Sequence, residues 1–299
     1  MKLGTVEHQG QRKVVACIDD DTLLDLSGDY ADMVALVQAG PSALDAIRAR
    51  LAAPDTVIAM GEVTMRCPIM PVQYRDCMVH EAHLQNAYDQ MSKKTGNPAP
   101  KIPQVWYDQP VYYKGNRMSF IGSGQDVRWP TYCDWMDFEL ELAIVVGKDG
   151  RDIQADQADA HIFGYTILND MSARDAQMVE MAGGLGPAKG KDFDTGNILG
   201  PWIVTADEIA SPVALAMDAY VNGERWGGGN SDAMHHSFGD ILAHVSQSET
   251  IYAGEVIGSG TVGTGCGLEL DKRLADGDRI DLTIEKIGTL SNTIRKVGA

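Results

Sequence analysis

Cysteine is scarce in this 299-residue chain, and no two cysteines form a CxxC pair. The five cysteines are widely spread and odd in number, which argues against a disulfide framework or a zinc knuckle and predicts small buried side chains. The chain also lacks long apolar runs, and its N-terminus lacks the basic-then-apolar layout of a signal peptide. We therefore expect a cytoplasmic protein without a membrane partner.

Positive charge is in short supply as well. The sequence has 25 Lys and Arg residues against 42 Asp and Glu residues, for a formal net charge of -17. Such an acidic surface repels nucleic-acid backbones and anionic lipid head groups, so we expect neither as a partner. With 44% hydrophobic and 22% charged residues, the composition is that of a globular protein and excludes disordered and fibrous classes.

The pattern of apolar residues divides the chain into a small unit and a large one. Residues 2–27 alternate short apolar runs with Gly, Gln and Asp clusters, which indicates two or three strands. Residues 29–52 carry apolar residues at helical spacing, with Gly40-Pro41 as a break between two short helices. The proline-containing stretch "GEVTMRCPIMPV" is the candidate boundary. We predict a small N-terminal α+β domain at 1–68 and a catalytic domain at 69–299.

The larger unit is mostly β in pattern. Short strands alternate with Gly-rich turns, and Asn222-Gly223 is the dipeptide favoured in a type I′ hairpin. Helices are expected near 154–160, from about Ser172, and around 237–246. A doubly wound sheet would need regular strand-helix alternation, which is missing. The sequence therefore predicts an α+β fold dominated by a mixed sheet or rolled barrel.

Two glutamates interrupt the apolar stretch "MDFELELAIVVG". Because alternate residues of a strand leave the same face, Glu139 and Glu141 lie side by side there. An isolated ExE pattern usually marks a solvent-exposed face. The following apolar run, however, indicates a strand covered on both sides, and a buried carboxylate pair needs a cation.

Further acidic residues stand where strands end. Asp170 closes an apolar strand, with Ser172 after it as a plausible helix N-cap, and Asp76 precedes His80 and His83. Asp170 could equally serve only as a capping residue. Several carboxylates without a thiolate or imidazole pair match a hard cation such as Mg²⁺ or Mn²⁺.

These stretches resemble the fumarylacetoacetate hydrolase superfamily. The matching segments follow one another from about residue 72 to the C-terminus: "MDFELELAIVVGKDGRDI", "GYTILNDMSARDAQ", "KGKDFDTGNILGPWIVT", "VNGE" and "GSGTVGTG…LEL…GDRIDLTIEKIG". The resemblance implies a mixed β-sheet roll or barrel of the fumarylacetoacetase C-terminal type. It also implies a homodimer, a small-molecule keto-acid substrate and a divalent metal, with Mg²⁺ as the first choice and Mn²⁺ or Ca²⁺ as alternatives.

The resemblance assigns roles to individual residues. The implied metal ligands are Asp76, Glu139, Glu141 and Asp170. The implied catalytic residues are His83 as general base, Glu269 as its orienting partner, and Lys191 and Gln177 as oxyanion stabilisers, with Lys189 close enough to be confused with Lys191. The implied substrate-contacting residues are Tyr113 and Thr261. Met78 stands where relatives carry an aromatic residue, so substrate preference does not transfer by analogy.

The reaction implied is metal-dependent hydrolysis of a carbon-carbon bond in a β-diketo acid, giving a carboxylic acid and a 2-keto acid in aromatic or sugar-acid breakdown. In this scheme His83 would activate a water molecule. A lyase or isomerase on the same scaffold is the alternative: an oxaloacetate-type decarboxylase, a sugar-acid dehydratase or a keto-enol isomerase. The sequence also leaves open a non-catalytic cation-binding or ligand-sensing protein. The stretches "EMAGGLGPAKG" and "LQNAYDQMSKKTGNPAPKIPQVWY" are candidate lids over the site.

Overall fold

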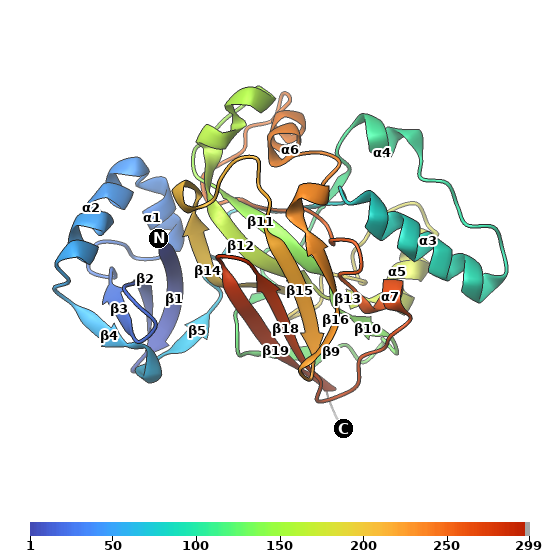
Figure 1. Ribbon diagram of the computed structural model, residues 1–299, viewed down its shortest axis with the longest axis horizontal. Coiled ribbons are helices and arrows are strands. Elements are labelled where there is room, and N and C mark those ends of the chain that lie inside the picture. Colours follow the sequence, from blue (N-terminus) through green and yellow to red (C-terminus); the bar gives the residue numbers. More distant parts are fainter. Residues whose placement is uncertain (297–299) are drawn as a thin grey trace.

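Strands dominate the computed structural model, which describes residues 1–296 (Figure 1). The strands are β1 (Lys2–His8), β2 (Gln11–Cys17), β3 (Thr22–Asp25), β4 (Val57–Ala59), β5 (Thr64–Arg66), β6 (Tyr74–Cys77), β7 (Tyr112–Lys114), β8 (Phe120–Ile121), β9 (Asp126–Trp129), β10 (Met136–Asp137), β11 (Leu140–Val146), β12 (Ile162–Asp170), β13 (Ser172–Ala173), β14 (Asn197–Thr205), β15 (Ala216–Val221), β16 (Glu224–Asn230), β17 (Val256–Gly258), β18 (Arg279–Ile284) and β19 (Gly288–Lys296). The helices are α1 (Met33–Gln38), α2 (Pro41–Ala52), α3 (Glu81–Thr95), α4 (Gln104–Asp108), α5 (Arg174–Met181), α6 (Phe238–Val245) and α7 (Gly267–Leu270), with 3₁₀ turns η1 (Met60–Glu62), η2 (Ala155–His161), η3 (Ala206–Glu208) and η4 (Ser231–Ala233).

The expected α+β class with mixed sheets is confirmed. Within the described residues, a 12-stranded sheet runs β4-β3-β2-β1-β14-β12-β11-β17-β6-β7, with β5 beside β1 and β8 beside β14. A 5-stranded sheet runs β16-β15-β18-β19-β9, and β10 pairs with β13. Most neighbours are antiparallel, whereas β6 runs parallel to β17, β8 to β14 and β9 to β19. The strand orders describe open sheets, not a closed barrel.

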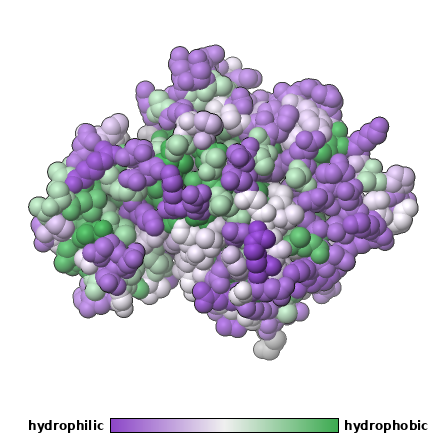
Figure 2. All heavy atoms as spheres, in the orientation of Figure 1, coloured by the Kyte–Doolittle hydropathy of each residue, from purple (hydrophilic) through white to green (hydrophobic). Residues whose placement is uncertain are grey.

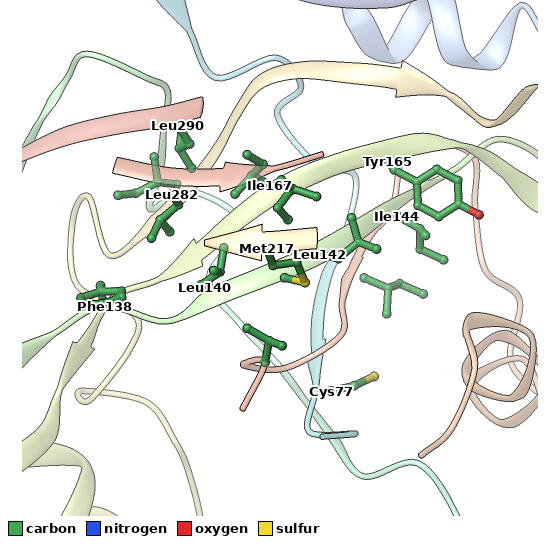
Figure 3. Packing of buried hydrophobic residues seen from close by; sticks show 14 of the residues in the cluster. Cys77, Phe138, Leu140, Leu142, Ile144, Tyr165, Ile167, Met217, Leu282 and Leu290 are labelled. Carbon is green, nitrogen blue, oxygen red and sulfur yellow. The ribbon is translucent and has the colours of Figure 1, made fainter. Parts of the chain in front are cut away.

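The main core lies between the large sheet and the 5-stranded sheet. Leu140, Leu142 and Ile144 leave one face of β11 and meet Met217 of β15 and Leu282 of β18 (Figure 3). All five side chains are buried, and burying a side chain of this size stabilises a fold by about 1.5–3 kcal/mol. The opposite face of β11 is therefore free to carry the glutamates.

The first strands continue the large sheet. β1 pairs with β14 through Lys2 and Leu3, so the N-terminal elements extend the central sheet toward the left of Figure 1. The expected helix break is confirmed, because α1 ends at Gln38 and α2 begins at Pro41 after Gly40, whose φ is 73°. The domain boundary near residue 68 stays a prediction, and residues 297–299 of the predicted catalytic domain lie outside the described residues.

The structure confirms some of the predicted turns and helix caps and contradicts others. Asn222 and Gly223 have φ of 52° and 81° between β15 and β16, as the hairpin prediction requires. Ser237 caps α6 with a capping box, whereas the helix expected near 154–160 is the 3₁₀ turn η2. The expected cap at Ser172 is wrong. This residue belongs to β13, Ala173 precedes α5, and the Ser172 hydroxyl instead accepts a hydrogen bond from Lys191.

The surface is mostly hydrophilic on the face shown in Figure 2, as the net charge leads one to expect, with smaller hydrophobic groups over the N-terminal elements. Among residues 1–296, no helix has the length and apolar character needed to cross a bilayer. The cytoplasmic location, the homodimer and the absence of a nucleic-acid partner stay predictions.

Candidate active site

Strand register brings the predicted metal-binding carboxylates onto one face of the large sheet. Asp76 of β6 is level with Gly258 of β17, which is level in turn with Ala143 of β11. Glu141 precedes Ala143 by two residues and therefore leaves the same face. Glu141 is paired with Leu168 of β12, and Asp170 follows Leu168 by two residues. Strand register and the alternation of side chains along each strand therefore direct Asp76, Glu141 and Asp170 to the same face of the sheet.

A glycine provides the space in which these carboxylates meet. An added Cβ at Gly258 would lie 2.2 Å from Asp76 Oδ1 and 2.8 Å from Glu141 Oε2. Oxygen atoms of Asp76, Glu141 and Asp170 all lie within 4.8 Å of one another. A side chain at position 258 would therefore occupy the space in which Asp76 and Glu141 meet.

The donor set of this cluster fits a hard divalent cation. Asp76, Glu141 and Asp170 are each at most 3% exposed, and Asp76 Oδ1, Glu141 Oε1 and Asp170 Oδ1 have no hydrogen-bond partner among the described residues. A buried carboxylate oxygen without a partner is costly, and a cation removes that cost. Three converging carboxylates suit Mg²⁺, Mn²⁺ or Ca²⁺.

Glu139, the fourth predicted ligand, is paired with protein cations. Its Oε1 atom lies 2.7 Å from Arg174 Nη1, and its Oε2 atom accepts a hydrogen bond from Lys191. Burial opposes ionisation of Glu139, but Lys191 and then Arg174 outweigh it and hold the pKa of this carboxyl below its ordinary value. Glu139 is therefore ionised, and it borders the cluster of Asp76, Glu141 and Asp170.

Lys191 connects Glu139 to that cluster. Its Nζ atom also donates to Asp170 Oδ2 at 2.6 Å and to Ser172 Oγ at 2.7 Å. Although burial disfavours the charge, the Asp170 and Glu139 carboxylates raise the pKa of Lys191 above its ordinary value. With three acceptors, the three hydrogens of the ammonium group are all engaged.

The segment before Lys191 approaches α5 closely. An added Cβ at Gly190 would lie 2.7 Å from Gln177 Cβ. The Glu180 carboxylate accepts hydrogen bonds from the backbone N–H groups of Ala188, Lys189 and Gly190. These contacts bring Lys191, and not Lys189, into the cavity.

His83 and Glu269 are brought together from distant parts of the chain. His83 lies in α3, Glu269 lies in α7, and His83 Nδ1 is 2.8 Å from Glu269 Oε1. In the neutral tautomer that donates from Nδ1 to Glu269 Oε1, Nε2 carries the lone pair. His83 lines the same cavity as the carboxylates.

Three further contacts hold Glu269 in place. Its Oε2 atom accepts hydrogen bonds from Asn86 Nδ2 at 2.8 Å and from the Thr264 backbone N–H at 2.7 Å. The Cys266 thiol lies 3.3 Å from Oε1. Because α3 contributes both His83 and Asn86, the geometry of the histidine-glutamate pair is set by the packing of α3 against α7.

A cavity of about 330 Å³ contains these groups, a volume at the small end of the range of about 300–1,000 Å³ for ligand pockets. All ten residues predicted from the sequence except Glu269 line it directly: Asp76, His83, Tyr113, Glu139, Glu141, Asp170, Gln177, Lys191 and Thr261. Glu269 reaches it through His83. A larger cavity of about 580 Å³ beside α2 and η2 contains none of them.

The predicted residues Tyr113, Gln177 and Thr261 differ in whether their polar groups already make hydrogen bonds within the protein. Tyr113 donates its hydroxyl hydrogen to Asp170 Oδ2 at 2.8 Å. Gln177 accepts from Arg174 through Oε1 at 3.1 Å, which leaves its NH₂ group directed elsewhere. Thr261 is 3% exposed and lines the cavity, with its backbone next to Gly260, whose N–H donates to Glu141 Oε2.

Arg174 is the site residue that the sequence predictions missed. It is 3% exposed, pairs with Glu139, and donates from Nε and Nη2 to Asp137 Oδ2 at 2.9 and 2.8 Å. Asp137 in turn accepts from the backbone N–H groups of Gly267 and Leu268 at the start of α7. Arg174 stands within the "NDMSARDAQ" stretch directly after a buried strand, and that position was the available signal.

Comparison with known proteins identifies the family of this chain. The family model for the fumarylacetoacetate (FAA) hydrolase C-terminal domain matches residues 78–295. The chain belongs to the fumarylacetoacetate hydrolase family. The resemblance inferred from the motifs is thereby confirmed.

Two curated relatives in the fumarylacetoacetate hydrolase family share an activity name. The human mitochondrial oxaloacetate tautomerase FAHD2A is 34% identical over 263 residues, covering 88% of this chain and 79% of its own. The oxaloacetate tautomerase YisK of Bacillus subtilis is 30% identical over 313 residues, covering 98% of this chain and 100% of its own. Among solved structures, the fumarylacetoacetate hydrolase of Exiguobacterium antarcticum has a TM-score of 0.79 at 26% identity and covers 99% of this chain and 100% of its own.

Replacing Gly258 tests whether the carboxylate cluster is the cation site. In Gly258→Ala, the new Cβ displaces Asp76 Oδ1, and we expect isothermal titration to show divalent-cation affinity weakened about tenfold or more. Gly61→Ala is the matched control, because an added Cβ there meets no atom within 4 Å. Equal affinity in the two variants would contradict the assignment.

Cation binding is expected to release protons. Burial, and then the neighbouring Asp170 for Asp76 and Asp76 for Glu141, raises the pKa of both carboxyls well above the ordinary value. Without a cation these groups therefore keep protons at pH values where exposed carboxyls have lost them, and a cation must displace those protons. Affinity should rise with pH. Titration in buffers of different ionisation enthalpy measures the release, and Asp76→Asn should reduce it.

Proposed function

We propose that this protein catalyses metal-dependent keto-enol tautomerisation of a 2-keto acid, with oxaloacetate as the first substrate to test. The observation that carries this choice is the 34% identity to a relative named as an oxaloacetate tautomerase, over 88% of the chain. The reaction moves a proton from the carbon next to the keto group onto the keto oxygen. It therefore needs a base beside groups that stabilise an enolate oxygen, and the cavity holds both kinds of group.

His83 is the base in this proposal. Its Nε2 atom has a lone pair, because Glu269 accepts the hydrogen on Nδ1. Nε2 takes the proton from C3 of the keto acid, and the resulting imidazolium, stabilised by Glu269, then donates a proton to the oxygen on C2. Atoms and charge balance without a co-reactant, since the proton leaves carbon and returns on oxygen.

Uncommitted donors stabilise the oxygen as charge develops on it. Gln177 presents its NH₂ group, since Arg174 engages its oxygen, and Thr261 lines the same cavity. Lys191 has no hydrogen to spare while Glu139, Asp170 and Ser172 accept from it. Lys191 therefore acts first as the counter-charge that keeps Glu139 and Asp170 in place.

The carboxylate cluster is the proposed cation site. Asp76, Glu141 and Asp170 would hold the ion, with Glu139 bordering it. An ion held there would supply Lewis-acid stabilisation of the enolate. Mg²⁺ is the first candidate, with Mn²⁺ and Ca²⁺ as alternatives.

Hydrolysis of a β-diketo acid is the second candidate, because the histidine-glutamate pair is equally suited to it. The same Nε2 atom of His83 could take a proton from water and direct the hydroxide at a carbonyl carbon. The 2.8 Å contact between His83 and Glu269 does not separate the two reactions, because each requires an oriented base.

One experiment separates these reactions. The decay of enol oxaloacetate is followed by ultraviolet absorbance with purified protein, with EDTA, and after adding back Mg²⁺ or Mn²⁺. Pyruvate release from acylpyruvates and from oxaloacetate is measured in parallel. Metal-dependent acceleration of enol decay without pyruvate release supports the tautomerase. Cleavage of acylpyruvates without such acceleration would replace it by the hydrolase, and pyruvate from oxaloacetate would indicate a decarboxylase.

His83→Ala distinguishes an enzyme from a cation-binding sensor. Loss of the base should lower kcat by about 10²–10⁴-fold, the usual contribution of general acid-base catalysis, while titration shows cation affinity close to that of the unmodified protein. His8→Ala is the control, since His8 lies in β1 outside the cavity. Unchanged turnover in His83→Ala would rule out His83 as the base.

A further inference from the structure

The active-site cavity has a charged interior and an apolar entrance. The carboxylates and their two cations lie deep, with Asp76, Lys191 and Arg174 at most 3% exposed. The cavity is also lined by Met91 from α3 and by Met178 and Met181 from α5, which are 43%, 45% and 57% exposed. Met78, Val111 and Leu268 are further apolar residues that line the cavity.

The cations that line this cavity are already paired with protein carboxylates. Lys191 contacts Glu139 and Asp170, and Arg174 contacts Glu139 and Asp137. Among the described residues, no other Lys or Arg lines the cavity. A ligand that extends from the charged interior toward the entrance therefore meets methionine side chains and no available positive charge.

The contrast between the charged interior and the apolar entrance determines which substituent on C3 of a 2-keto acid binds favourably. Oxaloacetate has a second carboxylate there, and placing a carboxylate against methionine side chains removes part of its hydration without supplying a counter-ion. An apolar group at the same carbon gains from removing methionine and ligand surface from water. Methionine is flexible and polarisable, so a wall of methionines adapts to aryl groups and contacts their ring edges favourably.

We propose that the methionine-lined entrance, defined by Met91, Met178 and Met181, is a binding subsite for an apolar substituent, so that the preferred substrates are 2-keto acids with an aryl or branched alkyl group on C3. This inference rests on the proposed keto-enol chemistry and specifies its substrate class. The carboxylate and keto oxygens of such a substrate enter the charged interior. The substituent lies between α3 and α5, which stand near each other at the right of Figure 1.

Oxaloacetate and phenylpyruvate are a matched pair for the test, because they differ only in carrying a carboxylate or a phenyl group on C3. We expect the holoenzyme to tautomerise both, with kcat/KM at least about tenfold higher for phenylpyruvate, a ratio that a hydrophobic pocket readily achieves. A preference for oxaloacetate would overturn the subsite while leaving the proposed reaction intact. Failure to accelerate the tautomerisation of either acid would overturn both.

Charge substitution at the entrance makes the test specific to these residues. Met91→Arg and Met178→Arg each supply a counter-ion for a second carboxylate, and the phenylpyruvate-to-oxaloacetate ratio of kcat/KM should fall about tenfold or more. Met118→Arg is the control, because Met118 is 65% exposed and lies outside the cavity, and its ratio should not change. Circular dichroism checks that each variant is folded.

An alternative occupant of the entrance is a second copy of the chain. If Met91→Arg and Met178→Arg leave the substrate ratio unchanged but reduce the mass measured by sedimentation, the methionines belong to a contact between copies and the proposal is wrong. If the ratio is unchanged and the mass is also unchanged, the entrance does not select the substituent, and the proposal is equally wrong.

Discussion

The constraint on which the rest of the site depends is the burial of like charges. Four carboxylates line one cavity with Lys191 and Arg174 as their protein counter-ions, and a carboxylate taken out of water is stable only when it is paired or neutralised. Glu139 forms ion pairs with both Arg174 and Lys191. Burial, and then repulsion from Asp170 for Asp76 and from Asp76 for Glu141, raises the pKa of both carboxyls and favours their protonated forms until a divalent ion replaces the protons. The three converging carboxylates of Asp76, Glu141 and Asp170 are therefore the candidate site for such an ion.

The scaffold meets this constraint by keeping the two faces of β11 different. Leu140, Leu142 and Ile144 build the core against the 5-stranded sheet, and that packing leaves the other face to Glu141, with Glu139 directly before the strand. A shift of one residue in the register of β11 would exchange the faces and lose both the core and the site. Stability and chemistry therefore depend on the same strand register.

The acid-base pair is set by a different kind of interaction. His83 and Glu269 lie 186 residues apart in sequence, and helix packing together with the contacts of Asn86 and Thr264 holds them together. Because an oriented base could serve proton transfer at carbon as well as water activation, the pair by itself does not separate the proposed tautomerase from the hydrolase. Beyond the pair, the cavity of this chain offers an apolar entrance.

Much of the fold and most of the candidate site could be predicted from the sequence. Strand alternation places Glu139 and Glu141 on one face, the Asn222-Gly223 turn follows from the preference of those residues for positive φ, and the motifs identify the family. Local pattern was misleading at Ser172, where a cap signal lost to a strand pairing and to the hydrogen bond from Lys191. The hydrolase expectation likewise followed the family name, whereas the relatives with the same activity name support the isomerase alternative.

By itself, the sequence determined the family, the fold class and the residue types of the site, because these depend on local periodicity and on motifs that are contiguous in the chain. Only the tertiary structure decided that Arg174 neutralises Glu139, that Lys191 has no uncommitted hydrogen, and that Gly258 opens the space between Asp76 and Glu141. These contacts join strands and helices that are distant along the chain. Sheet register and helix packing therefore determine which charged side chains pair with each other. Neither of them can be predicted from the spacing of residues along the chain.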